Sequence, residues 1–211
     1  NQLCYVLPPL AVGQLDYGTY SDTIDILKKY AYVYKYDDRG NQIYKRLPGC
    51  KPILMVYDKS NSLVLTQTGN QRRQGELWTI HEYDSLRRLI YTAEVIMPII
   101  SSHEELIEDY SNKLIVESFS GESQTGYSRN FFTHVKQILT VNYYDDYHHL
   151  PLISSNKRRN MIFAAFNGNA TCANATGLLT GTRTYYLDGS GDYSETVYYY
   201  DYRGREIQRR T

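Results

Sequence analysis

The stretch Tyr36-Asp-Asp-Arg-Gly-Asn-Gln-Ile43 decides the fold, because it recurs along the chain in related form. The residues before it alternate in character, with Tyr32 and Tyr34 on one face, and a period of two is the signature of a β-strand. Gly40 tolerates the positive φ of a tight turn, and Asp37 can accept hydrogen bonds from backbone N–H groups across it. The stretch therefore predicts a β-hairpin.

Four further copies of this unit follow, and their aspartates are spaced by 21, 26, 61 and 56 residues. The residues of the repeat are Tyr36, Asp37, Gly40, Tyr57, Asp58, Asn61, Tyr83, Asp84, Tyr144, Asp145, Tyr200, Asp201 and Gly204. The turn position holds Gly or Asn in three copies, which predicts left-handed backbone there. It holds Arg87 in the third copy and His148 in the fourth, so we expect wider or strained turns at these two places.

Composition agrees with a sheet protein. The chain has 211 residues, of which 23 are tyrosines, and tyrosine suits half-buried sheet surfaces because its ring is apolar and its hydroxyl is wet. We expect an all-β fold of antiparallel hairpin repeats that form a curved, strip-like sheet with one or two short helices. The 23 basic and 23 acidic residues balance, which argues against a nucleic-acid-binding protein. The longest apolar runs are much shorter than the roughly 20 residues of a membrane-spanning helix.

Two segments interrupt the strand pattern and predict helices. Ser102 and Glu105 have the spacing of a capping box, which predicts a short helix over 102–110. A weaker signal, with leading aspartates and closing lysines, covers 21–30. We therefore expect four parts. They are a lead-in with a short helix over 1–30, three hairpins over 31–93, an insertion with a helix and a loop over 94–137, and two hairpins separated by a polar loop over 138–211.

The repeat resembles a known family. The pattern Tyr-x-Tyr-Asp-x-x-Gly-Arg is similar to the YD repeats of RHS proteins, which are large secreted or surface proteins of bacteria with animal teneurins as relatives. The spacers between copies look like those of RHS-repeat proteins from Bacteroidetes. Examples are Leu47-Pro-Gly-Cys50, Val56-Tyr-Asp-Lys59, Gly69-Asn-Gln-Arg72 and Gly177-Leu-Leu-Thr-Gly181. The resemblance covers the chain from about residue 30 to the end.

The resemblance implies a fold and a role. RHS repeats form a long antiparallel strip that spirals into a hollow shell, and in toxin-bearing members the shell encloses a C-terminal toxin. The core motif that precedes the toxin is not found in this sequence. We therefore expect a non-catalytic structural segment of a secreted or cell-surface scaffold, whose partner is the remainder of its own longer chain. Whether a toxin follows stays open.

The sequence contains no catalytic motif, and we expect no enzyme and no cofactor. Asp145, Asp146, His148 and His149 are close in sequence, but they occupy a turn of the repeat and favour a solvated turn over a metal site. Paired carboxylates for glycoside hydrolysis leave no local spacing, so that alternative stays open. The three cysteines, Cys4, Cys50 and Cys172, form no zinc or redox motif, and any disulfide among them is unassigned.

A second function remains as an alternative. Tyr32, Tyr34 and Tyr198 lie on predicted sheet faces, where flat rings beside hydroxyl groups can stack on sugars. The chain would then be a carbohydrate-binding adhesion surface with glycans as partners. Packing against neighbouring repeats is the favoured role for these rings, because a repeat unit cannot bury its own face alone.

Overall fold

The computed structural model describes residues 2–15, 24–75, 77–97, 102–132, 134–153 and 175–211. Within these residues eleven strands follow one another as an antiparallel meander, in which each strand has its chain neighbours beside it. The fold is all-β with a few short helices, as the sequence predicts. The strands are β1 (Tyr5–Val6), β2 (Tyr32–Tyr36), β3 (Gln42–Arg46), β4 (Ile53–Tyr57), β5 (Leu63–Gln67), β6 (Leu77–Tyr83), β7 (Leu89–Ile96), β8 (Val135–Asp145), β9 (Ala175–Tyr185), β10 (Tyr193–Tyr200) and β11 (Glu206–Arg210).

Contacts divide the chain into two compact units. Unit 1 consists of residues 1–80 and 95–115, and unit 2 of residues 81–94 and 116–211. Each unit is described by itself below. The division into 1–30, 31–93, 94–137 and 138–211 that the motifs predict follows the repeats and not the contacts, so it stays a prediction.

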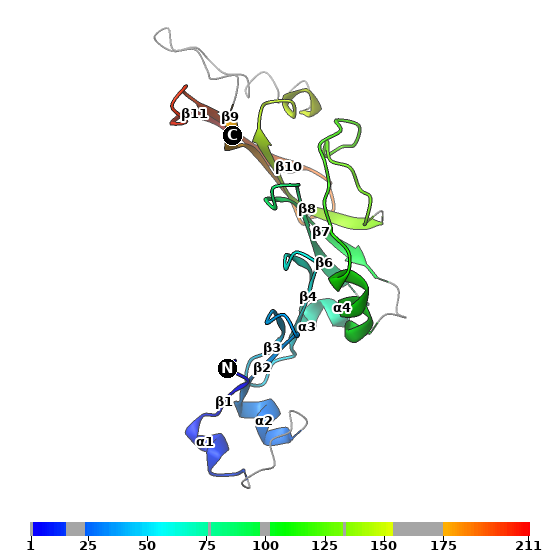
Figure 1. The fold of residues 1–211 in the computed structure, drawn as a ribbon, viewed down its shortest axis with the longest axis vertical. Helices are drawn as coiled ribbons and strands as arrows, with labels where there is room; N and C mark the ends of the chain where they lie inside the picture. The colour runs from blue at the N-terminus through cyan, green and yellow to red at the C-terminus, as the bar shows by residue number, and fades with distance from the viewer. Residues whose placement is uncertain (1, 16–23, 76, 98–101, 133, 154–174) are drawn as a thin grey trace. The chain divides into compact units, whose positions relative to one another are not determined.

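In unit 1 the hairpins β2–β3 and β4–β5 follow directly on each other (Figure 1). In the first hairpin Val33 pairs with Arg46, and in the second Leu54 pairs with Gln67. Both ladders shift register next to the tyrosine that precedes the turn. The extra residue at such a bulge bends the strand and increases its twist.

Short helices cover parts of unit 1. Helix α2 (Asp25–Tyr30) buries Leu27 against Val33 of β2, with partly buried Tyr5 and Tyr44 around them. It is the described part of the helix predicted over 21–30, because residues 21–23 lie outside the described residues. The two remaining helices before β6 are short: α1 (Pro9–Val12) and α3 (Gly69–Arg73).

The helix predicted over 102–110 is α4 (His103–Ser111), which packs against β4 (Figure 1). Its capping box is complete: the Ser102 hydroxyl accepts from Glu105 N at 3.1 Å, and Ser102 N donates to the Glu105 carboxylate at 2.8 Å. A cap of this kind contributes about 1 kcal/mol to a helix. Nε2 of His103 lies 3.0 Å from the Met55 carbonyl oxygen, which fixes the helix on β4.

Unit 2 contains the longest strands, β8 and β9, and the loop over 116–132 covers one face of them. The loop is bound to the sheet from both sides: Tyr127 donates to the Asn142 carbonyl at 2.8 Å, and Tyr143 donates to the Thr125 carbonyl at 2.9 Å. The carboxylate of Glu117, which is 1% exposed, accepts from Asn130 N at 2.7 Å and so closes the loop on itself. A short 3-10 helix, η1 (Leu150–Leu152), follows β8.

An ion pair lies beneath this cover. Arg183 of β9 and Glu195 of β10 are 3.1 Å apart, and their side chains are 1% and 0% exposed. A second nitrogen of Arg183 donates to the Gln124 carbonyl at 3.0 Å. A buried pair is costly to break, because the remaining charge would have no counterion. The described residues include no helix with the length and apolar character needed to cross a membrane.

Candidate functional site: the Tyr-Asp turns

The turn at Asp37 is closed by one carboxylate oxygen. Oδ1 of Asp37 accepts from the backbone N–H of Arg39 at 3.0 Å and of Asn41 at 2.8 Å. The backbone adds two bonds, from Asp37 N to the Asn41 carbonyl and from Gly40 N to the Asp37 carbonyl, both at 3.0 Å. The side chain thus occupies the inside of the turn and satisfies N–H groups that the sheet leaves unpaired.

Three other copies repeat this arrangement. In each, the aspartate Oδ1 accepts from the N–H groups two and four residues later, at distances of 2.9 to 3.0 Å. The aspartates are Asp58, Asp84 and Asp201. The turn residue has positive φ in all four copies: 88° at Gly40, 63° at Asn61, 64° at Arg87 and 73° at Gly204.

Of the two alternatives expected for the third turn, a wider or a strained turn, the structure has the strained one: the turn is not widened by the absence of glycine. Arg87 adopts the left-handed backbone, and Asp84 makes the same bonds as Asp37 does. A non-glycine residue in this region costs of order 1 kcal/mol, which the closed turn must offset. The Arg87 guanidinium lies 5.2 Å from the centroid of the Tyr83 ring and so keeps a contact within its own turn.

The fourth copy differs from the rest. Asp145 itself has a φ of 74°, and its carboxylate accepts from Gly177 N at 2.7 Å instead of closing a turn behind it. It pairs with Ala175 at the start of β9, so residues 146–174 separate the two strands. The tight hairpin aligned on Asp145 is not formed, and the Asp145 carboxylate bonds elsewhere.

Arg88 connects the third copy to the fourth. Its Nε donates to Asp84 at 2.6 Å, while its two terminal nitrogens donate to the two oxygens of Asp145 at 2.9 and 2.6 Å. The guanidinium also lies 4.4 Å from the centroid of the Tyr144 ring. The hydrogen bonds from Arg88 are the main reason why the pKa of Asp145 lies below its ordinary value.

The tyrosine of the motif has its own repeated contact, which a phenylalanine could not make. In four copies its hydroxyl donates to a backbone carbonyl of an earlier segment of the chain, outside the hairpin of the tyrosine itself. The four bonds are Tyr36 to Leu3 at 3.1 Å, Tyr57 to Gln42 at 3.2 Å, Tyr144 to Leu89 at 3.1 Å and Tyr200 to Leu179 at 2.7 Å. This hydroxyl gives a physical reason for the tyrosine content of the chain.

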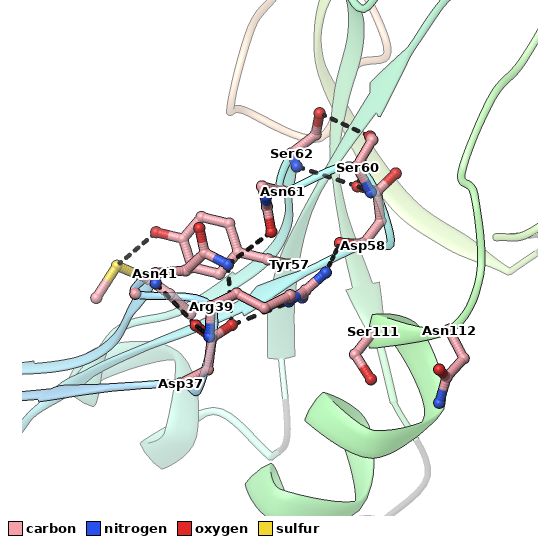
Figure 2. Close-up of polar contacts among 12 residues, drawn as sticks. Asp37, Arg39, Asn41, Tyr57, Asp58, Ser60, Asn61, Ser62, Ser111 and Asn112 are labelled. Atoms are coloured by element: carbon pink, nitrogen blue, oxygen red, sulfur yellow. Dashed lines mark hydrogen bonds and ion pairs between the residues drawn. The ribbon is translucent and has the colours of Figure 1, made fainter.

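Successive turns also contact each other, as Figure 2 shows for the first two. Nη1 of Arg39 donates to the Asp58 carbonyl at 2.8 Å, and the Asn41 amide donates to the Asn61 side chain at 3.0 Å. The same amide donates to Asp37 at 2.9 Å, so one side chain joins its own turn to the next. The turns in unit 1 therefore form a hydrogen-bonded row along the hairpin ends.

The Asp58 turn is further fixed from the other side. Oδ2 of Asp58 accepts from Ile115 N at 3.2 Å, and Lys59 N donates to the Lys113 carbonyl at 2.8 Å. Asp58 is 0% exposed in consequence. These contacts come from the segment after α4, so no motif local to the turn could have predicted them.

The residues considered for a metal site separate in the structure. Asp146 and His148 form an exposed pair, with Nδ1 of His148 2.8 Å from the Asp146 carboxylate. His149 is instead 1% exposed and stacks on Tyr143 with ring centroids 4.3 Å apart. Burial lowers the pKa of His149 to about 3. Within the part of the chain that the structure describes, no three His, Cys, Asp or Glu side chains gather as metal ligands.

A cavity of about 290 Å³ lies in unit 2 beside the Arg88 bridge, between Asp84 and the covering loop. Phe119 and Tyr127 are among its walls and meet edge to face at 5.5 Å. The carboxylates on its lining already accept hydrogen bonds from Arg88 or from backbone N–H groups. These carboxylates hold the turns and the covering loop in place, so we do not assign a ligand to this cavity.

The tyrosines considered for ligand stacking are half-buried and lie in different units. Tyr32 and Tyr34 are in β2 of unit 1, where they alternate with buried Val33. Tyr198 is in β10 of unit 2, and the Arg209 guanidinium covers its ring at 5.0 Å. Cys4 and Cys50 are free, exposed thiols, and Cys172 lies outside the described residues.

Comparisons with protein-family models and with curated proteins gave no match to this chain.

Proposed function

We propose that the chain is a structural, non-catalytic segment of a secreted or cell-surface scaffold of the RHS type, built from YD repeats. The observation that carries the proposal is the repeated turn. The closing aspartate, the left-handed turn residue and the tyrosine hydroxyl bond occur together in three copies, those at Tyr36, Tyr57 and Tyr200. Most of the repeated polar groups of the motif hold the chain together: four of the five aspartates close a turn, and four of the five tyrosine hydroxyls bond to an earlier segment. Few are left for chemistry on a substrate.

The arrangement suits a scaffold for a physical reason. A meander in which each hairpin bonds to the next can be lengthened by adding units, as in other repeat proteins. The tyrosine hydroxyl and the Arg39 and Asn41 side chains supply those unit-to-unit bonds in unit 1. The expected partner of such a segment is more of the same chain.

Two measurements test this proposal. The first is to read the native coding frame on both sides of the 211 residues, where we expect further Tyr-Asp hairpins. The second is to stain intact producing cells with an antibody raised against the chain, with staining of permeabilised cells as the control. We expect signal on intact cells or in the medium. Signal only after permeabilisation, together with flanking sequence that has no repeat, would contradict the proposal.

A second candidate function is glycan binding through tyrosine faces, and the partial exposure of Tyr32 and Tyr34 is the observation in its favour. Tyr34→Ala separates the two functions. If the ring serves packing, the variant melts at a lower temperature than the wild type. If it serves binding, the variant keeps its melting temperature and loses retention on a glycan array that retains the wild type.

A further inference from the structure

Unit 2 contains a second cavity, also of about 290 Å³, which differs from the first in its charge. Arg129 and Lys136 line it together with Gln124, Gln137 and Tyr185, and no acidic residue is among the residues on its wall. Val135 and Ile138 add apolar surface. A cavity with two cations, amide groups and an aromatic wall favours an anionic ligand with a partly apolar body.

Arg129 is the group that makes this cavity unusual. Among the described residues its Nε is buried and has no hydrogen-bond partner, and no ion pair is formed by its guanidinium. A guanidinium is always charged and presents a planar fork of donors, so leaving it unpaired under a protein surface is costly. The fork matches the two oxygens of a carboxylate.

The acidic residues near Arg129 do not neutralise it. Glu117 accepts hydrogen bonds from Ser128, Asn130 and Phe131, which occupy both of its oxygens. Glu82 of β6 is 1% exposed, and its Oε1 has no partner among the described residues. Burial, followed by the charge of Glu117, raises the pKa of Glu82 to about 8. The raised pKa favours the protonated form of Glu82 near pH 7, and neither carboxyl group bonds to the buried Nε of Arg129.

A third buried polar group lies in the same place. Tyr91 of β7 is 1% exposed, and its hydroxyl has no partner among the described residues. Arg129, Glu82 and Tyr185 all act electrostatically on Tyr91, which places the four groups close together under the covering loop. Buried polar groups are nearly always hydrogen-bonded, so three unpartnered atoms close together favour a polar ligand here. Of the three residues, Arg129 lines the cavity, and Glu82 and Tyr91 lie behind its wall.

We propose that this cavity binds a small organic carboxylate, whose two oxygens are held by Arg129 and whose body lies along Tyr185 and the apolar wall. A monoanion fits better than a phosphate dianion, because Arg129 is the one cation on the cavity wall that is partly buried and has a buried unpaired nitrogen, whereas Lys136 is exposed to solvent. Free organic acids, uronic sugars and peptide C-termini share this chemistry. The inference goes beyond the proposed scaffold role and does not depend on it.

Glu82 gives the site a pH dependence with a definite sign. Below its pKa Glu82 is neutral and leaves Arg129 available. Above it, the ionised Glu82 becomes the counterion of Arg129 and competes with the ligand. The charged groups that act on Glu82 are Glu117 and Arg129, and the hydroxyl of Tyr91 lies in the same group. Affinity should therefore fall as pH rises through about 8.

The test uses the whole chain and benzoate as the probe, with benzamide as the neutral molecule of the same shape, in titration calorimetry at millimolar concentrations. We expect benzoate to bind and benzamide to bind at least about tenfold more weakly, as for loss of a charge-assisted pair. Glucuronate against glucose, and a peptide with a free against an amidated C-terminus, distinguish the sources of carboxylate. Equal binding of benzoate and benzamide, or no binding of any carboxylate, would overturn the proposal.

Variants locate the site. Arg129→Gln should weaken benzoate binding by about tenfold or more. Arg129→Lys keeps the charge and loses the fork, so its affinity for benzoate should lie between those of the wild type and Arg129→Gln. Arg203→Gln, at an exposed turn of the same unit, is the matched control and should bind as the wild type does. Near-ultraviolet circular dichroism of the tyrosines verifies that unit 2 stays folded. If Arg129→Gln does not fold, Lys136→Gln replaces it, and a weakening of about twofold or more is then expected.

Glu82→Gln tests the pH dependence. One pH unit above the Glu82 pKa, the wild type should bind benzoate about tenfold more weakly than at neutral pH, because ionised Glu82 competes for Arg129. The Glu82→Gln variant should change less than about twofold over the same interval. An equal pH dependence in both proteins would contradict the role of Arg129 as the group that Glu82 and the ligand share.

Discussion

The turns at Asp58 and Asp201 contain the same hydrogen bonds in different surroundings. Each carboxylate accepts from the N–H groups two and four residues later. Asp58 is fully buried and also bonds to Ile115 of a distant segment, whereas the Asp201 side chain is 14% exposed at a hairpin end where its partner Arg205 is 68% exposed. The comparison shows that local sequence builds the turn, while distant contacts decide how much the turn stabilises the protein.

The largest effect is expected for Asp58→Ala. Removing the buried carboxylate leaves the N–H groups of Ser60, Ser62 and Ile115 without an acceptor, and each unsatisfied buried group costs about 1 to 3 kcal/mol. We expect a loss of about 3 to 5 kcal/mol of unfolding free energy in unit 1.

Urea unfolding followed by Trp78 fluorescence measures this loss, because Trp78 is the one tryptophan in the sequence, is 3% exposed and stacks on His103 in unit 1. Asp58→Asn is the control, since its amide oxygen can still accept and should restore part of the stability. A loss below about 1 kcal/mol for Asp58→Ala would show that the turn does not depend on the carboxylate.

The contrast between buried and exposed positions extends to two adjacent histidines. His149 is buried and its pKa is lowered to about 3, so in the unfolded chain it binds a proton at higher pH than in the folded protein. Stability should therefore fall as pH falls from about 6.5 toward 3, by up to about 1.4 kcal/mol per pH unit. His149→Phe should make this acid limb shallower, with His81 accounting for part of what remains.

His148→Gln is the control, because the His148 side chain is 76% exposed. Thermal unfolding of both variants at several pH values gives the two slopes. If His149→Phe leaves the acid limb as steep as in the wild type, burial of the imidazole is not what makes the protein sensitive to acid.

Arg88 offers a case between the two extremes, because its side chain is 22% exposed and holds both Asp84 and Asp145. Arg88→Ala should lower the stability of unit 2 by about 1 to 3 kcal/mol. Arg88→Lys keeps the charge but loses the fork that binds the two oxygens of Asp145, and should recover less than half of the loss. Tyrosine circular dichroism during urea unfolding reports on unit 2, and full recovery by lysine would contradict the bridging geometry.

The smallest effect is expected for Asp201→Ala. Water can replace the carboxylate at this exposed turn, so the loss should be several-fold smaller than for Asp58→Ala. The same tyrosine signal measures it, with Asp201→Asn as the control. A loss as large as that of Asp58→Ala would mean that the turn itself, and not its burial, sets the contribution.

Local chemistry made part of this structure predictable. The positive φ at Gly40, Asn61 and Gly204, the aspartate bonds inside these turns and the capping box at Ser102 all follow from residues within five positions of one another. The order of the strands in the sheet is the order of the hairpins along the chain. Such features need no knowledge of the rest of the chain.

What could not be predicted depends on residues far apart in the sequence. Arg88 reaches Asp145 across 57 positions, which removes that aspartate from turn closure. Arg87 looked unsuited to its turn, yet the carboxylate of Asp84 is sufficient to hold it there. The group of Glu82, Tyr91 and Arg129 comes from two strands and a loop, and no spacing in the sequence marks it.

Amide hydrogen exchange tests the central claim, that one carboxylate closes each of four turns, most directly. The account predicts slow exchange at the amides two and four residues after Asp37, Asp58, Asp84 and Asp201. It predicts faster exchange at Asp38, Ser85 and Tyr202, the residues directly after three of these aspartates, and slow exchange at Lys59, whose amide donates to the Lys113 carbonyl. In Asp84→Ala, protection should be lost at Leu86 and Arg88 and kept in the turn at Asp58. If these amides exchange at unfolded-chain rates in the wild type, the aspartates do not close the turns and the account is wrong.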